Sequence, residues 1–144
     1  MSQNNKKVSG KILGGIIKIE IFTFSDFAQD NNGKLTIVGT FDTIIARSFP
    51  CVHPQLSIAI RMRFELWEFT KHTFRIEVND LDGETVMEPI KGYIDIKESG
   101  NATSFTDLVF TISNMHFNNP GIINFVIYLD DKEAGYIPLY IRKG

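Results

Sequence analysis

The chain has 144 residues, and its length, 43% hydrophobic content and 12 phenylalanines fit one globular domain with its own core. The 15 Lys and Arg residues nearly balance the 17 Asp and Glu residues, and no basic run is longer than Lys6-Lys7, so the clustered cations that attract duplex nucleic acid are missing. No segment approaches the roughly 20 apolar residues of a membrane span. We therefore expect no nucleic acid and no membrane among its partners.

The cysteine content and the N-terminal region indicate the compartment. Cys51 is the only cysteine in the sequence, so it cannot form the internal disulfides that are common in secreted β-domains. The apolar stretch at residues 12–17 is short and ends at Lys18, unlike the longer apolar run of a signal peptide. We expect a cytoplasmic protein.

The first predicted strand covers residues 16–24, which are β-branched and aromatic on both faces, as in a strand covered on both sides. Asp30-Asn31-Asn32-Gly33 favours a turn, and residues 34–39 resume as a strand. Residues 41–49 fit either a bulged strand or one helical turn. Phe49-Pro50 and Pro54 are expected to bracket a loop, because proline lacks the hydrogen-bond donor that a central strand needs.

Residues 55–66 carry the clearest alternation of the chain. One predicted face is apolar: Leu56, Ile58, Ile60, Met62, Phe64 and Leu66. The other is polar and charged: Gln55, Ser57, Ala59, Arg61, Arg63 and Glu65. Successive strand side chains point to opposite faces, so we expect a strand with its charged face in water. Ile60→Asp should then cost several kcal/mol and unfold the domain, whereas Arg61→Asp should change the stability by only about ±0.5 kcal/mol.

The rest of the chain repeats the pattern of short alternating runs separated by turns. The expected inward residues are Phe74, Ile76, Val78, Ile90, Ile94, Ile96, Leu108, Phe110, Ile112, Ile123, Phe125, Ile127, Leu129, Ile137, Leu139 and Ile141. The expected turns lie at residues 80–83, 99–101, 118–121 and 130–133, the last of them closing a hairpin. This predicts an all-β fold, a two-sheet antiparallel β-sandwich of about eight strands. We expect residues 1–11 to be flexible and residues 12–144 to form a single sandwich domain.

Cys51 and His53 are the residues closest to a nucleophile and base pair. Cysteine chemistry needs a base within hydrogen-bond reach and a third group that orients it, and no third group is identifiable here. His53, His72 and His116 show no zinc-ligand spacing with Cys51. We interpret Cys51 as a partly buried thiol beside a loop imidazole.

Two acidic turns raise the alternative of a calcium site. Asp80, Asp82 and Glu84 surround Gly83, and a second acidic group, Asp130, Asp131 and Glu133, crowds the later turn. Calcium-binding loops collect carboxylates. However, Asp and Gly are also what hairpin turns need for their own hydrogen bonds and positive φ, which is the interpretation we prefer.

Trp67-Glu68-Phe69 follows the longest strand. Aromatic side chains at a loop tip can stack on a sugar or anchor a partner, or they can fold back over the end of the sandwich. We favour the second interpretation, because large side chains are mostly buried. Ser25-Asp26 lacks a nucleophile motif, and the glycines 10, 14 and 15 lack the Gly-Lys-Ser/Thr of a phosphate loop.

Three stretches carry a resemblance to a known family. They are Phe24-Ser25-Asp26-Phe27-Ala28 with the run from Gly33 to Asp42, then Phe49-Pro50, and finally Pro120-Gly121 ahead of the terminal hairpin. From about residue 16 onward the chain resembles an uncharacterised bacterial family, catalogued as a domain of unknown function. The resemblance implies an immunoglobulin- or C2-like β-sandwich and brings no active site.

These observations favour a non-catalytic binding or assembly module over an enzyme. We assign no catalytic, cofactor-binding or metal-ligating residue and expect no cofactor. The edge strands of an open sandwich predict a protein partner or self-association. The alternative is a calcium- or carbohydrate-binding module that uses the acidic turns or Trp67.

Overall fold

The computed structural model describes residues 18–144, which contain nine β-strands, one short 3-10 helix and no α-helix. The elements are β2 (Lys18–Asn31), β3 (Lys34–Phe41), β4 (Thr43–Ala46), β5 (Cys51–Glu65), the 3-10 helix η1 (Leu66–Glu68), β6 (Lys71–Asp80), β7 (Thr85–Asp95), β8 (Thr103–Phe117), β9 (Gly121–Leu129) and β10 (Lys132–Lys143). The flexible segment expected at residues 1–11 lies outside the described residues.

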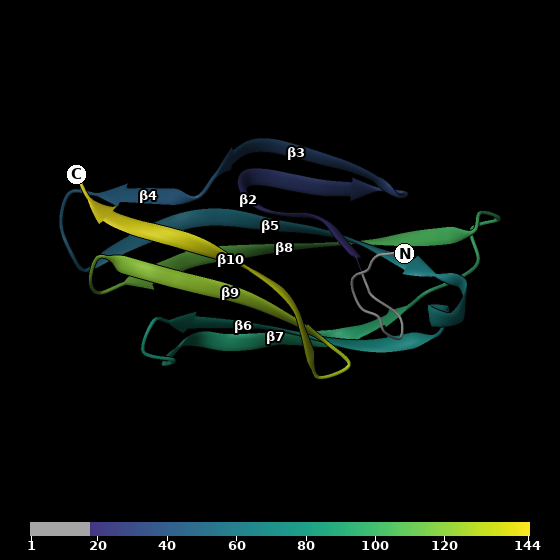
Figure 1. Cartoon of the computed structure of the whole chain (residues 1–144). Coiled ribbons are helices and arrows are strands. Elements are labelled where there is room, and N and C mark those ends of the chain that lie inside the picture. The colour runs from purple at the N-terminus through teal and green to yellow at the C-terminus, as the bar shows by residue number, and fades with distance from the viewer. Residues whose placement is uncertain (1–17) are drawn as a thin grey trace, which may run out of the picture.

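The strands form two sheets that pack face to face (Figure 1). One sheet has the order β4-β10-β9-β6-β7, and the other has the order β3-β2-β5-β8. The all-β, two-sheet prediction is confirmed. The prediction of a wholly antiparallel sandwich is wrong at one pair, because β4 runs parallel to the end of β10.

The segment left open between a bulged strand and a helical turn is a strand that changes sheets. β3 belongs to the four-stranded sheet and β4 to the five-stranded sheet, so the chain crosses between the layers at Asp42. The carbonyl oxygen of Asp42 accepts a hydrogen bond of 2.8 Å from the backbone N–H of Tyr140. Because of this crossing, the fold has one strand more than the predicted eight, namely β4, which pairs in parallel with β10.

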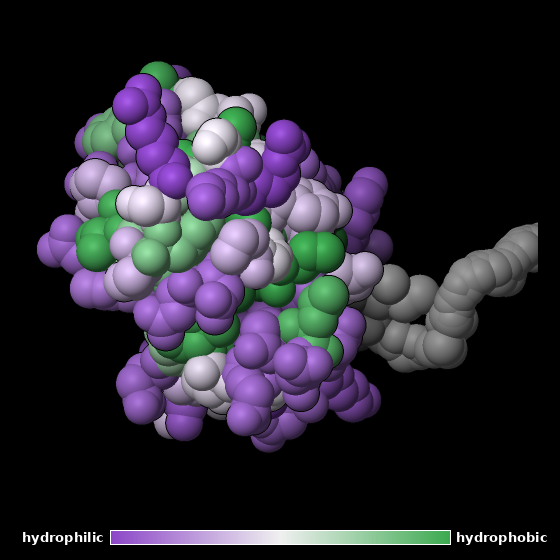
Figure 2. Space-filling model, turned by 90° about the vertical axis from the view of Figure 1, so that its left-hand side faces the viewer, coloured by the Kyte–Doolittle hydropathy of each residue, from purple (hydrophilic) through white to green (hydrophobic). Residues whose placement is uncertain are grey.

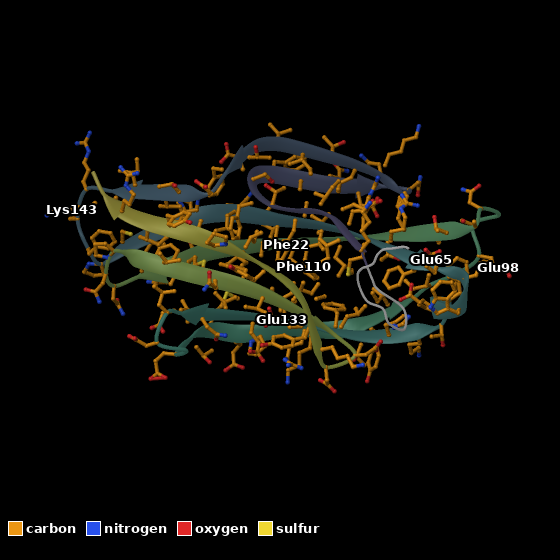
Figure 3. The ribbon with its side chains drawn as sticks, in the orientation of Figure 1. Phe22, Glu65, Glu98, Phe110, Glu133 and Lys143 are labelled. Carbon is orange, nitrogen blue, oxygen red and sulfur yellow. The ribbon has the colours of Figure 1, made fainter. Side chains whose placement is uncertain are left out.

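The core lies between the sheets and contains the alternating residues that the sequence predicts. The labelled Phe22 and Phe110 lie in the space between the two layers (Figure 3). Fully buried positions include Leu56, Ile58, Ile60, Met62, Phe64, Ile76, Val78, Phe125, Ile127, Leu139 and Ile141. Leu66 is an exception: it lies in η1 rather than in β5 and is exposed.

The opposite face of β5 is not in water as predicted. β2 pairs with β5 only as far as Ser25, and its second half pairs with β3 alone. Figure 1 shows β2 curving so that this second half and β3 lie above β5. Ser57 and Ala59 are buried as a result, and the carbonyl of Gly33 in the β2–β3 turn accepts a hydrogen bond of 3.4 Å from Arg61.

The loop predicted around Pro54 is part of a strand. Cys51 to Gln55 pair in register with β8, opposite Phe117 to Ser113. Pro54 is tolerated because β2 has already left this end of β5, so no donor is required on that side. Asn114, opposite Pro54 in this register, has a positive φ of 53°. Before it the even-numbered residues of β8 face the core, and after it the odd-numbered Met115 and Phe117 do.

Candidate functional site

All four tyrosines of the chain lie on the outer face of the five-stranded sheet. They alternate with core residues, Tyr93 on β7, Tyr128 on β9, and Tyr136 and Tyr140 on β10. Tyr93 is 71% exposed and Tyr136 is 58% exposed. This surface was not predicted from the sequence. The signal for it is that every tyrosine alternates with the inward isoleucines and leucines of its strand.

A hollow of about 390 Å³ opens on this face around Arg75. It is lined by Thr73, Phe74, Arg75, Lys91, Gly92, Tyr93, Tyr128 and Asp131. The guanidinium carbon of Arg75 lies 4.2 Å from the ring centroid of Tyr128, within cation–π range. Its Nε donates to Glu77 at 2.7 Å and an Nη donates to Asp131 at 2.9 Å, which raises the pKa of Arg75 and fixes the side chain in place.

Two lysines flank the exposed ring of Tyr93. The ammonium nitrogen of Lys71 lies 5.5 Å from the Tyr93 ring centroid. Lys91 lines the hollow, and within residues 18–144 it belongs to no salt bridge. The hollow therefore combines aromatic surface with an ammonium group that can pair with a ligand carboxylate or donate hydrogen bonds to a ligand.

The hollow is connected to the core through Gly92. A Cβ atom at Gly92 would lie 2.7 Å from Cε1 of Phe74, so only glycine leaves room for that ring. The Phe74 ring in turn lies 5.7 Å from the ring of Phe110 on β8. The packing of Gly92 on this ring therefore fixes the position of β7 next to Tyr93 relative to the core.

A buried histidine positions the β9–β10 turn beside the hollow. His72 Nδ1 lies 2.5 Å from Oδ2 of Asp130, and its Nε2 lies 2.7 Å from the carbonyl oxygen of Glu68. The other carboxylate oxygen of Asp130 accepts the N–H of Thr73 at 3.1 Å. Asp130 and Asp131 both adopt positive φ, and this turn brings Asp131 to Arg75.

The charge state of His72 follows from these contacts. Burial by itself lowers the pKa of the imidazole, but the hydrogen bonds to Asp130 and Glu68 outweigh it, so the pKa is raised. Both ring nitrogens face acceptor oxygens, and only the imidazolium carries a proton on each. These contacts favour the protonated imidazole of His72, which links η1 to the β9–β10 turn.

The structure separates the residues that could have formed a cysteine or zinc site. Cys51 and His53 lie on β5 rather than in a loop, and Cys51 packs partly against the core. The ring of His53 lies 5.9 Å from that of Phe41. His72 binds Asp130, and His116 lies on β8 opposite Val52.

The acidic turns use their carboxylates internally. Oδ1 of Asp80 accepts the backbone N–H groups of Asp82 and Glu84 at 2.9 Å each, as a turn-forming aspartate does. Asp130 and Asp131 are bound to His72 and Arg75. Within residues 18–144 no group of three or more His, Cys, Asp or Glu side chains could hold a metal ion.

The Trp67 segment lies at one end of the sandwich, the end marked by Glu65 and Glu98 in Figure 3. Phe69 packs against the core, as the folded-back interpretation predicts. The same prediction is wrong for Trp67, which is 71% exposed. The reason is the single turn of η1, which directs Glu68 inward and leaves Trp67 in solvent.

The opposite end, seen in Figure 2, carries a second hollow of about 570 Å³ between the β6–β7 and β8–β9 turns. Hydrophilic and hydrophobic residues are mixed over this end, without one large apolar area (Figure 2). Asp82, His116 and Asn119 line the hollow. Its polar lining lacks the stacked cation and rings of the hollow around Arg75.

The remaining sequence candidates have structural roles or lie outside the described residues. Ser25 is fully buried, and its hydroxyl donates to the carbonyl of Phe27 at 3.1 Å. Asp26 lies against Gly39, where a Cβ atom would come within 2.6 Å of its carboxylate. The glycines 10, 14 and 15 precede residue 18. The part of the chain from 18 to 144 has no helix with the length and hydrophobicity of a membrane span.

Two solved structures are similar to this chain. The chain is similar to part of the Pseudomonas fluorescens alkylpurine DNA glycosylase AlkC, solved bound to DNA containing an abasic site analogue, with a TM-score of 0.51, 10% identity, and coverage of 90% of this chain and 31% of that one. A β-glucosidase from Listeria innocua, in complex with isofagomine, matches with a TM-score of 0.48, 7% identity, and coverage of 90% and 16%. This chain thus spans less than a third of either protein. At 10% identity, the likeness to the glycosylase shows the fold alone.

Comparison with curated proteins finds no match. The model of one family, described as a family of unknown function (DUF6941), matches residues 20–142. This confirms the expected membership of an uncharacterised family, and the chain belongs to DUF6941.

Proposed function

We propose that this chain is a non-catalytic binding module and that its protein partner binds at the hollow around Arg75. One observation carries the proposal: Arg75 is held over Tyr128 beside the exposed ring of Tyr93. Tyrosine and arginine are enriched among the residues that dominate protein–protein binding energy. Tyrosine contributes a large contact area with few rotatable bonds, so ordering it costs little.

The hollow suits binding because Arg75 and Asp131 are already paired and oriented. Arg75 is fixed by Glu77 and Asp131, and the turn that carries Asp131 is fixed by His72. A surface that is ordered before the partner arrives loses less conformational entropy on association. The same pairing favours binding over acid–base catalysis, since Glu77, Asp130 and Asp131 each already accept a hydrogen bond from Arg75 or His72.

The proposal is tested by photo-crosslinking in cells of the natural host. A photoreactive amino acid replaces Tyr93 in one variant and Tyr136 in the control, which is exposed on the same face but does not line the hollow. We expect one protein to be crosslinked at position 93 and not at position 136. Adding Lys91→Glu to the position-93 variant should abolish the adduct, because it reverses the charge beside the ring.

A carbohydrate ligand is the second candidate, favoured by the exposed, flat ring of Tyr93 beside Lys91 and Thr73. Aromatic rings stack on sugars and neighbouring polar groups orient them. A glycan array distinguishes the two candidates. Glycan binding that is lost in Tyr93→Ala, together with no adduct at position 93 in cells, would replace the protein partner by a sugar.

We also infer an immunoglobulin-like type for the sandwich. If β5, β6, β7, β8, β9 and β10 correspond to strands B, C, C′, E, F and G, then one sheet has the order G-F-C-C′ and the other contains B beside E. The parallel β4 extends the first sheet beside G. We also propose that the protein is bacterial and that it is cytoplasmic. The single cysteine supports the cytoplasmic location.

A further inference from the structure

β8 is a long edge strand without protective features. It spans Thr103–Phe117 and lies at the end of the four-stranded sheet, so its side facing away from β5 has no strand neighbour within residues 18–144. It contains no proline, lysine or arginine. Its one acidic residue, Asp107, is bound by Arg61. Natural edge strands usually carry such residues, or are short or bulged, because unpaired backbone groups otherwise recruit another strand.

The other three edges are protected in these ways. β7 carries Pro89 and Lys91, and its register with β6 shifts twice. β3 is shorter and carries Gly39 with a φ of +71°. β4 has only four residues. Only β8, among the described edges, leaves a long regular segment open, from Thr103 to Ser113, before the positive φ of Asn114.

The core is also incompletely covered on the side where β8 and β7 face each other across the sandwich. The inward residues of both strands pack against the core but stay partly exposed there: Leu108, Phe110 and Ile112 from β8, and Val86, Met87 and Ile90 from β7. Phe110 is labelled between the two sheets in Figure 3. The unpaired backbone edge of β8 therefore lies beside these partly exposed apolar residues, which we call the apolar rim. A strand added to β8 would pair with the edge and cover the rim.

We propose that two copies of this chain pair through β8, antiparallel and about a two-fold axis perpendicular to the four-stranded sheet, so that the two sheets become continuous. This symmetry places each residue of β8 opposite one of the same parity, and therefore on the same face. The apolar rims of the two copies meet on one side of the joined sheet. The backbone groups at the β8 edge of each copy are then hydrogen-bonded to those of the other copy.

The occupant is a second copy because β8 is compatible with itself. No register of the antiparallel pair brings two unpaired like charges together, since Asp107 has a buried carboxylate already neutralised by Arg61. β8 offers no free cation or anion that would select a charged segment of another protein. This interface is distinct from the hollow around Arg75, which lies on the outer face of the other sheet.

The test is sedimentation velocity of the full chain over a wide range of protein concentration. The variant Thr111→Lys/Ser113→Lys places two cations per copy at exposed positions of β8. The control Thr36→Lys/Thr40→Lys makes the same changes at exposed positions of β3, on the opposite edge of the same sheet. We expect a dimer for the wild type and the control, and a dissociation constant raised about a hundredfold or more in the β8 variant, since lysines on an edge strand oppose the addition of another strand.

Hydrogen exchange of the wild type tests the same interface without a mutation. Backbone amides of β8 that point away from β5 should exchange slowly in the dimer and rapidly after dilution to the monomer. A wild type that is monomeric at every concentration would overturn the proposal. A β8 variant that dimerises as tightly as the wild type, or β8 amides that exchange equally fast in dimer and monomer, would also overturn it.

Discussion

Arg61 and Asp107 form a bidentate ion pair across β5 and β8, with N–O distances of 2.7 and 2.9 Å, and the Asp107 side chain is 1% exposed. Removing Arg61 would leave that carboxylate buried without its cation. We expect Arg61→Ala to lower the free energy of unfolding by about 3–5 kcal/mol, as measured by urea denaturation. The matched control is Arg63→Ala on the same face, whose partner Glu20 is 24% exposed and can be rehydrated. Equal losses in the two variants would contradict the buried pair.

Ile60→Asp keeps the effect that the sequence predicts. Ile60 is fully buried between the sheets, and a carboxylate there would lack any partner. We expect a loss of several kcal/mol in the same denaturation experiment, enough to unfold the domain. The expectation that Arg61→Asp costs only about 0.5 kcal/mol is replaced, because this change would place a second carboxylate beside Asp107.

These two neighbours show what the sequence could predict and what it could not. Alternation in residues 55–64 identifies the strand and its core face because period two is a property of the strand alone. Whether the other face meets water depends on β2, which bends after Ser25 and brings its hairpin back over β5. No local pattern encodes that approach, although the small side chains of Ser57 and Ala59 allow it.

The candidate site was missed for a similar reason. Tyr93, Arg75 and Tyr128 come from three strands, and they become neighbours only through the registers of β6 with β7 and with β9. The sequence does predict the β9–β10 turn that carries Asp131. It does not predict that His72, 58 residues from Asp130 in the chain, holds this turn in place.

Gly92→Ala should destabilise the protein. The added methyl group would lie 2.7 Å from a ring carbon of Phe74, which is confined by the core. We expect a loss of about 1–3 kcal/mol in thermal or urea unfolding. The control is Gly121→Ala on β9, where a Cβ atom meets nothing within 4 Å and which should be neutral or stabilising by about 0.5 kcal/mol. A neutral Gly92→Ala would show that the strand below the hollow can move.

The link through His72 should make stability depend on pH. The pKa of His72 is raised in the folded protein, so its contribution is fully present below the unfolded value of 6.5 and is lost as the pH rises through the folded value. In a pH titration, we expect the difference in unfolding free energy between wild type and Asp130→Asn to be largest below pH 6.5 and to shrink as the pH rises through the raised pKa of His72. The substitution keeps an acceptor for Thr73, removes the charge, and replaces the oxygen that His72 contacts by an amide NH2 donor. A difference that stays constant over this range would mean that His72 does not carry the proton.

Trp67 in η1 and Phe69 just after it should respond differently to truncation. Trp67 is exposed, so Trp67→Ala should change the free energy of unfolding by no more than about 0.5 kcal/mol. Phe69→Ala removes a ring that packs against the core, and we expect a loss of about 2 kcal/mol or more. Because the two residues differ by only two positions, effects on the unfolded chain nearly cancel, and the contrast reports their orientation in the fold. If Trp67→Ala proves the more costly change in urea denaturation, the indole packs against the protein and the orientation of η1 described above is wrong.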